Sequence, residues 1–231
     1  MSTSTASVPT TATSAPRFPL GALLLLSLAV FVTVTAESLP AGLLPEMVAG
    51  LQTDPLGVGL LISVWALTVI VTSIPLARLT ARFDRRLVAA VALAAFAVAN
   101  AATALAPTYE VAVATRIAAG VAHGLFWAIV IVYATSLLAP SHLGRGLALV
   151  TAGGTVATLA GLPAGALIAQ LLSWRWSFGV LAFVAFALAT AIAIRLPRRT
   201  PEPALPRAER PTGPDASLLP IVLFAAAALV F

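Results

Sequence analysis

The chain has 231 residues, of which 60% are hydrophobic and only 9% are Asp, Glu, Lys or Arg. A soluble domain carries about 25% charged residues, so this chain has too little charge to cover the surface of a soluble globule. The formal net charge is +5, and all thirteen basic residues are Arg. The sequence therefore predicts an integral membrane protein.

The residue counts exclude several kinds of site. The chain has no Cys, so it offers no disulfide, no thiolate nucleophile and no Cys-based metal site. His123 and His142 are isolated from each other, and neither a metal nor a cofactor is expected. The arginines lie between long apolar runs, where charge sets membrane topology, so nucleic-acid binding is not predicted.

Taken in chain order, a polar tail comes first and six apolar runs follow. Residues 1–18 are rich in Ser, Thr, Ala and Pro and are expected to form a disordered cytoplasmic tail. A membrane helix needs about 20 mostly apolar residues, and barrel strands would alternate apolar and polar residues, which these runs do not. The sequence predicts an all-α, six-helix bundle over 19–196. Its helices are expected at 20–47, 57–79, 87–106, 110–138, 146–172 and 175–196.

A change of composition follows the sixth helix. Residues 197–216 are Pro-rich and charged, which is typical of a flexible hydrophilic linker. Residues 217–231 form a new apolar run that is too short to span a membrane. We interpret this run as the incomplete start of a seventh helix. A short tail lying on the membrane surface is the alternative.

The placement of Arg predicts the orientation. Eleven of the thirteen arginines lie on one side of the predicted bundle, near the N-terminus, in the 2–3 and 4–5 loops or in the linker. Arg175 lies on the opposite side, and Arg116 lies within the fourth helix. The positive-inside rule then places the N-terminus and the linker in the cytoplasm. A signal peptide cleaved after Ala36 is an alternative, but apolar sequence continues past that residue and favours an uncleaved first helix.

Glu37 is the first candidate for a functional role. It lies past the middle of the first predicted helix, with no basic residue between Arg17 and Arg78. A carboxylate at membrane depth is costly unless it faces a cavity, pairs or takes up a proton, which is the behaviour of a proton-coupling group. If the helix ended early, Glu37 would instead be an interface residue.

The fourth predicted helix carries further candidates. Arg116, Gly120 and Gly124 are four residues apart, so they share one face, and the two glycines allow close approach of another helix. Arg116 is therefore expected in a helix–helix seam, with an interfacial, snorkelling Arg as the alternative. His123 could join a proton route or be a packing residue, and Trp127 could line a cavity or pack in the core.

Two more motifs lie in the loop between the second and third helices and in the fifth helix. The loop after the second helix holds Asp84 within an arginine cluster, which predicts either a charged gating latch or a plain topology signal; its arginines are Arg78, Arg82, Arg85 and Arg86. Gly161, Pro163 and Gly165 predict close helix packing and a local bend in the fifth helix.

These features together resemble the N-terminal half of a major facilitator superfamily transporter. The resemblance rests on Arg-x3-Gly-x3-Gly at 116–124, Gly-x-Pro-x-Gly at 161–165 and the stretch TAESLPAGLLPEMVAGL. That stretch is similar to the first helix of the bacterial drug- and sugar-efflux branch, the arabinose-efflux-permease-like proteins. Two motifs depart from the superfamily pattern. Ala81 replaces an Asp in the loop, and Leu162 separates the Gly and Pro of the antiporter signature.

The resemblance implies two six-helix bundles around a central cavity, working by alternating access in the cell membrane. It implies proton-coupled efflux of a small organic solute or drug, with Glu37 as the proton-sensitive acid and Arg116 as its electrostatic partner. The implied partners are the substrate, protons, the lipid bilayer and a C-terminal six-helix half. Uptake or facilitated diffusion is the alternative, followed by a membrane scaffold or sensor. An enzyme is not predicted, because the Gly-x-Ser-Gly turn of an intramembrane serine protease is missing.

Overall fold

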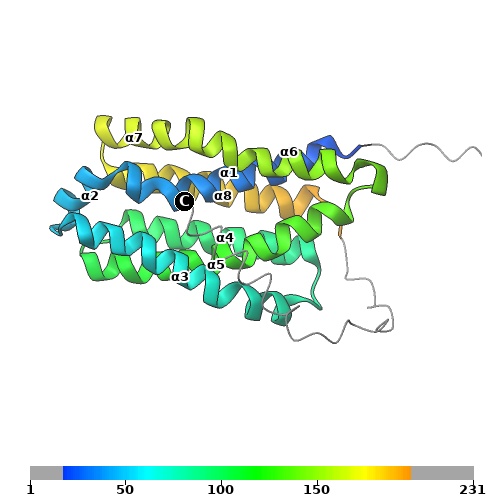
Figure 1. The fold of residues 1–231 in the computed structure, drawn as a ribbon, viewed down its shortest axis with the longest axis horizontal. Coiled ribbons are helices and arrows are strands. Elements are labelled where there is room, and N and C mark those ends of the chain that lie inside the picture. Colours follow the sequence, from blue (N-terminus) through cyan, green and yellow to red (C-terminus); the bar gives the residue numbers. More distant parts are fainter. Residues whose placement is uncertain (1–17, 199–231) are drawn as a thin grey trace, which may run out of the picture.

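The computed structural model describes residues 18–198, and within that range the chain is helical with no strand. Figure 1 shows the helices lying side by side along one long axis. Six stretches of the described residues are long and apolar enough to cross a membrane, which confirms the predicted all-α bundle. The helices are α1 Leu20–Gly42, α2 Leu44–Leu51, α3 Pro55–Thr80, α4 Arg85–Ala104, α5 Tyr109–Ser136, α6 Leu143–Val156, α7 Leu162–Leu171 and α8 Trp174–Arg195. Most of the predicted linker and the whole predicted seventh helix lie outside the described residues.

The first predicted helix, 20–47, is not continuous. It breaks at Leu43 into α1 and α2, and α2 then runs on to Leu51. Pro45 has no N–H to donate to the carbonyl four residues earlier, and Pro is tolerated in the first turn of a helix. The chain therefore ends α1 at Gly42 and starts α2 with Pro45 in its first turn. The two helices together still cross the full length of the bundle.

The fifth predicted helix is also interrupted. A short 3₁₀ turn, η1 (Pro140–His142), precedes α6, and a π-helical turn, η2 (Ala157–Gly161), separates α6 from α7. In the π turn, the N–H of Leu162 donates to the carbonyl of Ala157, five residues earlier. Pro163 follows in the first turn of α7, where its missing N–H is tolerated. The Gly-x-Pro-x-Gly motif therefore lies where the π turn joins α7.

Glycines bring α6 and α7 against α1. A Cβ at Gly153 would overlap the backbone of Ser27, and a Cβ at Gly161 would overlap the hydroxyl of Thr35. A Cβ at Gly165 would lie 2.7 Å from the Cδ1 of Leu39. Small residues allow membrane helices to approach this closely. The α1 face that carries Ser27, Thr35 and Leu39 is therefore packed closely on α6 and α7.

Gly153→Ala is expected to destabilise the bundle, because the new methyl group meets the α1 backbone, which cannot rotate away. Overpacking of this kind costs about 1–3 kcal/mol of folding free energy. Gly154→Ala is the matched control, since its Cβ would meet no atom closer than the Cγ2 of Val34 at 3.7 Å. Thermal unfolding and folded yield in detergent measure the difference. Equal melting temperatures for the two variants would contradict the close α1–α6 contact.

Gly120 and Gly124 bring α5 against α3. A Cβ at Gly120 would lie 3.2 Å from the Cβ of Thr68, and one at Gly124 would lie 2.8 Å from the Oγ of Ser73. The hydroxyl of Tyr109 also donates to the carbonyl of Gly57 at 2.9 Å, which ties the start of α5 to the start of α3. The face of α5 that carries Arg116 is thus packed on α3 within the described bundle.

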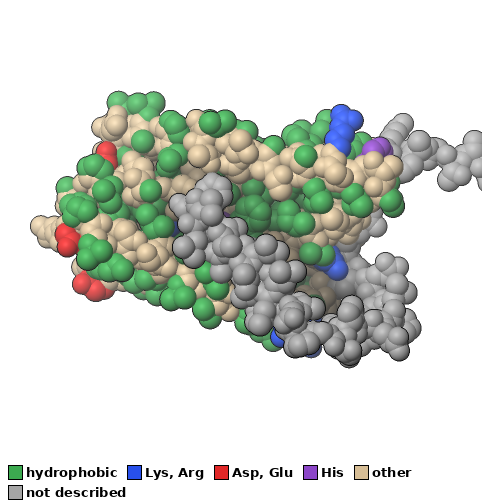
Figure 2. Space-filling view, in the orientation of Figure 1, with side chains coloured by type: hydrophobic (Ala, Val, Ile, Leu, Met, Phe, Trp, Pro, Cys, Tyr) green, Lys and Arg blue, Asp and Glu red, His purple; other side chains and the backbone are tan. Residues whose placement is uncertain are grey.

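The two ends of the bundle differ in charge. Figure 2 shows blue Arg side chains gathered at the end where α3 meets α4 and α8 stops, and red acidic side chains at the other end. We call the first the Arg-rich end; its arginines are Arg78, Arg82, Arg85, Arg86, Arg145, Arg195 and Arg198. The opposite, acidic end carries Glu46, Asp54, Glu110 and a lone Arg175. The first and last described residues both lie at the Arg-rich end (Figure 1).

Candidate functional site

Glu37 lies near the middle of the bundle. At 1.5 Å per helical residue it is about 26 Å from Leu20 and about 21 Å from Leu51 along the helices. Because α1 continues to Gly42 and α2 follows, the first helix does not end at Glu37. The side chain of Glu37 is 42% exposed on the surface of the bundle. The carboxylate therefore lies near the middle of the bundle's length, on a partly exposed face of α1.

His123 is the closest titratable partner of Glu37 among the described residues. Its Nε2 lies 3.4 Å from the Oε2 of Glu37, and its side chain is 4% exposed. The His comes from α5 and the Glu from α1, so the pair joins two helices that are distant in sequence. The contact therefore brings two titratable side chains from different helices together.

Arg116 is fully buried inside the bundle and does not reach an interface. Its Nη1 donates to the carbonyl of Ala36 at 3.0 Å, and its Nη2 donates to the main-chain carbonyl of Glu37 at 3.3 Å. Its Cζ lies 3.9 Å from the centre of the Trp65 ring, within the range of a cation–π contact. Within the described residues, both of its hydrogen bonds go to the backbone of α1, and neither reaches the Glu37 carboxylate.

Aromatic rings surround His123. The ring centres of Trp65, Phe96 and Trp127 lie 5.0, 6.0 and 6.2 Å from the centre of the imidazole. The Nδ1 of His123 and the Nε1 atoms of both Trp residues are buried, and none has a hydrogen-bond partner in the described part of the chain. Trp127 thus belongs to this cluster. Sequence reasoning missed Trp65 and Phe96, although Trp65 continues the buried i, i+4 face of α3 formed by Leu61 and Val69.

The expected gating loop divides into separate contacts. The Oδ1 of Asp84 accepts from the N–H of Arg86 at 2.9 Å and caps α4. The Nη1 of Arg86 donates to the carbonyl of Leu196 at 3.2 Å, just after α8. Arg78 and Arg82 are exposed. The structure therefore shows helix capping at Asp84 and a contact with the end of α8 at Arg86.

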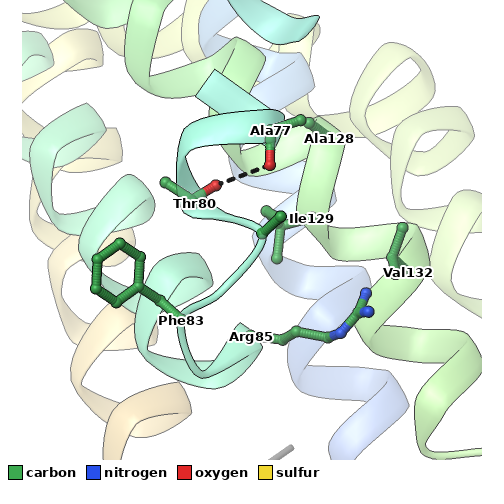
Figure 3. Close-up of a pocket in the computed structure, with 8 residues that line it drawn as sticks. Ala77, Thr80, Phe83, Arg85, Ala128, Ile129 and Val132 are labelled. Carbon is green, nitrogen blue, oxygen red and sulfur yellow. Dashed lines mark hydrogen bonds between the residues drawn. The ribbon is translucent and has the colours of Figure 1, made fainter. Parts of the chain in front are cut away.

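A small pocket lies under this loop. Its volume is about 150 Å³, and Figure 3 shows the Arg85 side chain reaching toward α5 beside Val132. The pocket is otherwise lined mainly by apolar groups from the end of α3, the loop and α5. It lies at the Arg-rich end and contains no residue of the Glu37–Arg116–His123 cluster. The candidate site is therefore the cluster at mid-depth, with the pocket as a separate feature.

Comparison with known proteins identifies the family. Residues 26–231 match the profile of the Major Facilitator Superfamily, which covers most of the chain. The chain belongs to the Major Facilitator Superfamily. This membership confirms the resemblance carried by the Arg116 and Gly161 motifs, and the six candidate membrane spans agree with a multi-pass membrane protein.

Relatives within the superfamily include proteins named for efflux. The chain is 39% identical over 171 residues to a chloramphenicol efflux pump of Mycobacterium tuberculosis (strain H37Rv), covering 74% of this chain and 41% of the pump. It is 31% identical over 181 residues to a probable sugar efflux transporter of Helicobacter pylori (strain G27), covering 78% of this chain and 46% of the transporter. The chain thus spans less than half the length of these curated relatives.

Proposed function

We propose that the full-length protein is a proton-coupled exporter of small organic molecules, and that Glu37 is its proton site. The observation that carries this proposal is a half-exposed carboxyl at mid-depth with a buried imidazole 3.4 Å away. A carboxyl at this depth is costly as an anion unless it faces a water-filled cavity, pairs or takes up a proton. Protonation and release at Glu37 can therefore be tied to a change in how α1 contacts its neighbours.

His123 supports this role because it can respond to the state of Glu37. When Glu37 is ionised, a neutral imidazole with its proton on Nε2 can donate toward the carboxylate. When Glu37 is protonated, its O–H can donate to an unprotonated Nε2 instead. The 3.4 Å separation is slightly longer than an ordinary hydrogen bond, so a small turn of the carboxyl group closes it. The two protonation states of Glu37 thus favour two arrangements of the same pair.

The open face of Glu37 supports a central cavity. In transporters of this architecture, substrate and coupling-ion sites lie near the bilayer midplane, between two bundles that rock against each other. The chain matches 41% and 46% of the two relatives' lengths. We therefore propose a second six-helix half as the partner that faces Glu37, with a small-molecule substrate and protons in the space between.

Orientation and substrate class complete the proposal. The Arg-rich end is assigned to the cytoplasm by the positive-inside rule, because the acidic end carries only Arg175 among the described arginines. The names of the relatives suggest chloramphenicol and sugars as first probes of the substrate. Both are small organic molecules without a net charge, which suits a site with a single half-exposed acid.

Transport by the reconstituted full-length protein tests the proposal. Proteoliposomes with an acidic interior are given labelled chloramphenicol or labelled monosaccharides outside, so that protons leaving by antiport drive substrate in. We expect the substrate to accumulate inside to a concentration above the external one. A protonophore, which dissipates the pH gradient, should abolish this accumulation. Entry that stops at equal concentrations inside and outside, with or without the protonophore, would contradict proton coupling and indicate facilitated diffusion.

A further inference from the structure

Pro40 leaves one carbonyl of α1 without its helical partner. In a regular α-helix, the carbonyl of Ala36 accepts from the N–H four residues later, and at that position Pro40 has no N–H. Both Ala36 and Pro40 are buried. An unpaired carbonyl in an apolar bundle is strongly unfavourable, so neighbouring helices usually supply a donor. The Ala36 carbonyl therefore requires a hydrogen-bond donor from another helix.

Arg116, in α5, supplies this donor. Its Nη1 reaches the carbonyl of Ala36 at 3.0 Å, and its Nη2 reaches the next carbonyl, that of Glu37, at 3.3 Å. The guanidinium is a planar fork, which lets one side chain bridge two consecutive carbonyls. The Trp65 ring lies against its face, with 3.9 Å between Cζ and the ring centre. The guanidinium group is therefore held between Trp65 of α3 and the turn of α1 whose Ala36 carbonyl lacks its helical donor.

We infer that Arg116 is a positioning residue that caps the Ala36 carbonyl left unpaired by Pro40 and thereby fixes the backbone at Glu37. The inference rests on the proposed function in so far as Glu37 is the proton site. The geometry favours it over a role as a charge partner, because both hydrogen bonds end on main-chain oxygens of α1. A charge partner needs only a positive charge, whereas a backbone bridge needs two donors and depends on Pro40.

A double-mutant cycle in the full-length protein separates these roles. Arg116→Lys keeps the charge but loses the fork, and Pro40→Ala restores the N–H that pairs with Ala36. We expect Arg116→Lys alone to lower the melting temperature in detergent by about 5 °C. In the Pro40→Ala background the same change should lower it by much less. If Arg116→Lys yields no folded protein, Arg116→Gln replaces it in the cycle, because the shorter Gln side chain has a single amide nitrogen and cannot bridge the two carbonyls.

Pro75→Ala is the matched control. Pro75 also lies inside a helix, but in α3, ten residues from the Trp65 that Arg116 contacts. The effects of Arg116→Lys and Pro75→Ala should simply add, as they do for distant sites. If the effects of Arg116→Lys and Pro40→Ala add in the same way, the backbone bridge is wrong.

The pH profile of transport supplies a readout that a purely structural role would not move. We expect Arg116→Lys and Pro40→Ala each to shift the midpoint of the profile by about one pH unit, with no further shift in the double variant. An unchanged midpoint in the folded variants would overturn the positioning role. The melting cycle needs no transport, so it tests the bridge even if the protein proves not to be proton-coupled.

Discussion

Glu37→Gln is expected to reduce proton-driven transport to the background of protein-free vesicles while the bundle stays folded. Gln has nearly the same shape as Glu and can still hydrogen-bond to His123, but it cannot gain or lose a proton. Accumulation of substrate in acid-loaded proteoliposomes measures the effect. Glu110→Gln is the matched control, because Glu110 is exposed at the acidic end of α5, and it should transport at the wild-type rate.

The exchange of labelled for unlabelled substrate distinguishes proton coupling from substrate binding. If Glu37 serves only the proton, the Glu37→Gln variant should still exchange substrate across the membrane without a pH gradient. Loss of exchange together with accumulation would assign the carboxyl to substrate binding. Accumulation at the wild-type rate would contradict the proposed role of Glu37 altogether.

Trp65→Ala is expected to be the most destabilising single change in the bundle. The ring is 1% exposed, lies against the Arg116 guanidinium at 3.9 Å and packs beside His123. Removing a buried Trp costs about 3–5 kcal/mol, through lost burial and the cavity that remains. We expect little folded protein by gel filtration in detergent, and a much lower melting temperature for what remains.

Trp176→Ala is the control for this prediction. Trp176 is 59% exposed at the start of α8, so its loss leaves no enclosed cavity. Its melting temperature should stay close to that of the wild type. Equal losses for the two Trp variants would show that the buried contacts of Trp65 do not stabilise the bundle more than an exposed ring does.

The spans could be predicted from sequence because the cost of burying polar backbone in lipid leaves helices as the main choice for long apolar runs. The run predicted at 87–106 forms α4 at Arg85–Ala104, for example. The break at Leu43 could not be placed, because prolines such as Pro40 and Pro45 are tolerated inside membrane helices. Whether a given Pro ends a helix depends on what the neighbouring helices donate, and that is set by packing.

The candidate site was predicted in part. Glu37 and Arg116 could be singled out because a charge at membrane depth needs a reason. The contacts that Glu37 and Arg116 make could not be predicted, because these contacts depend on the relative register of α1, α3 and α5. Trp65 is one apolar residue among many in α3, so its contact with Arg116 could be found only in the structure. Arg116 donates to the main-chain carbonyl of Ala36. From sequence, this carbonyl can be recognised as unpaired only because Pro40, four residues later, has no N–H to donate to it.

The end of α8 has a mechanical consequence. Tyr133 in α5 donates to the carbonyl of Pro197 at 2.7 Å, next to the Arg86 contact with Leu196 at 3.2 Å. Each such bond contributes about 0.5–1.5 kcal/mol net, and the two hold adjacent residues from different helices. Tension applied to the chain beyond Arg198 would therefore load α4 and α5 directly, before the last turn of α8 could unwind. A pull there would act on α4, α5 and α8 together.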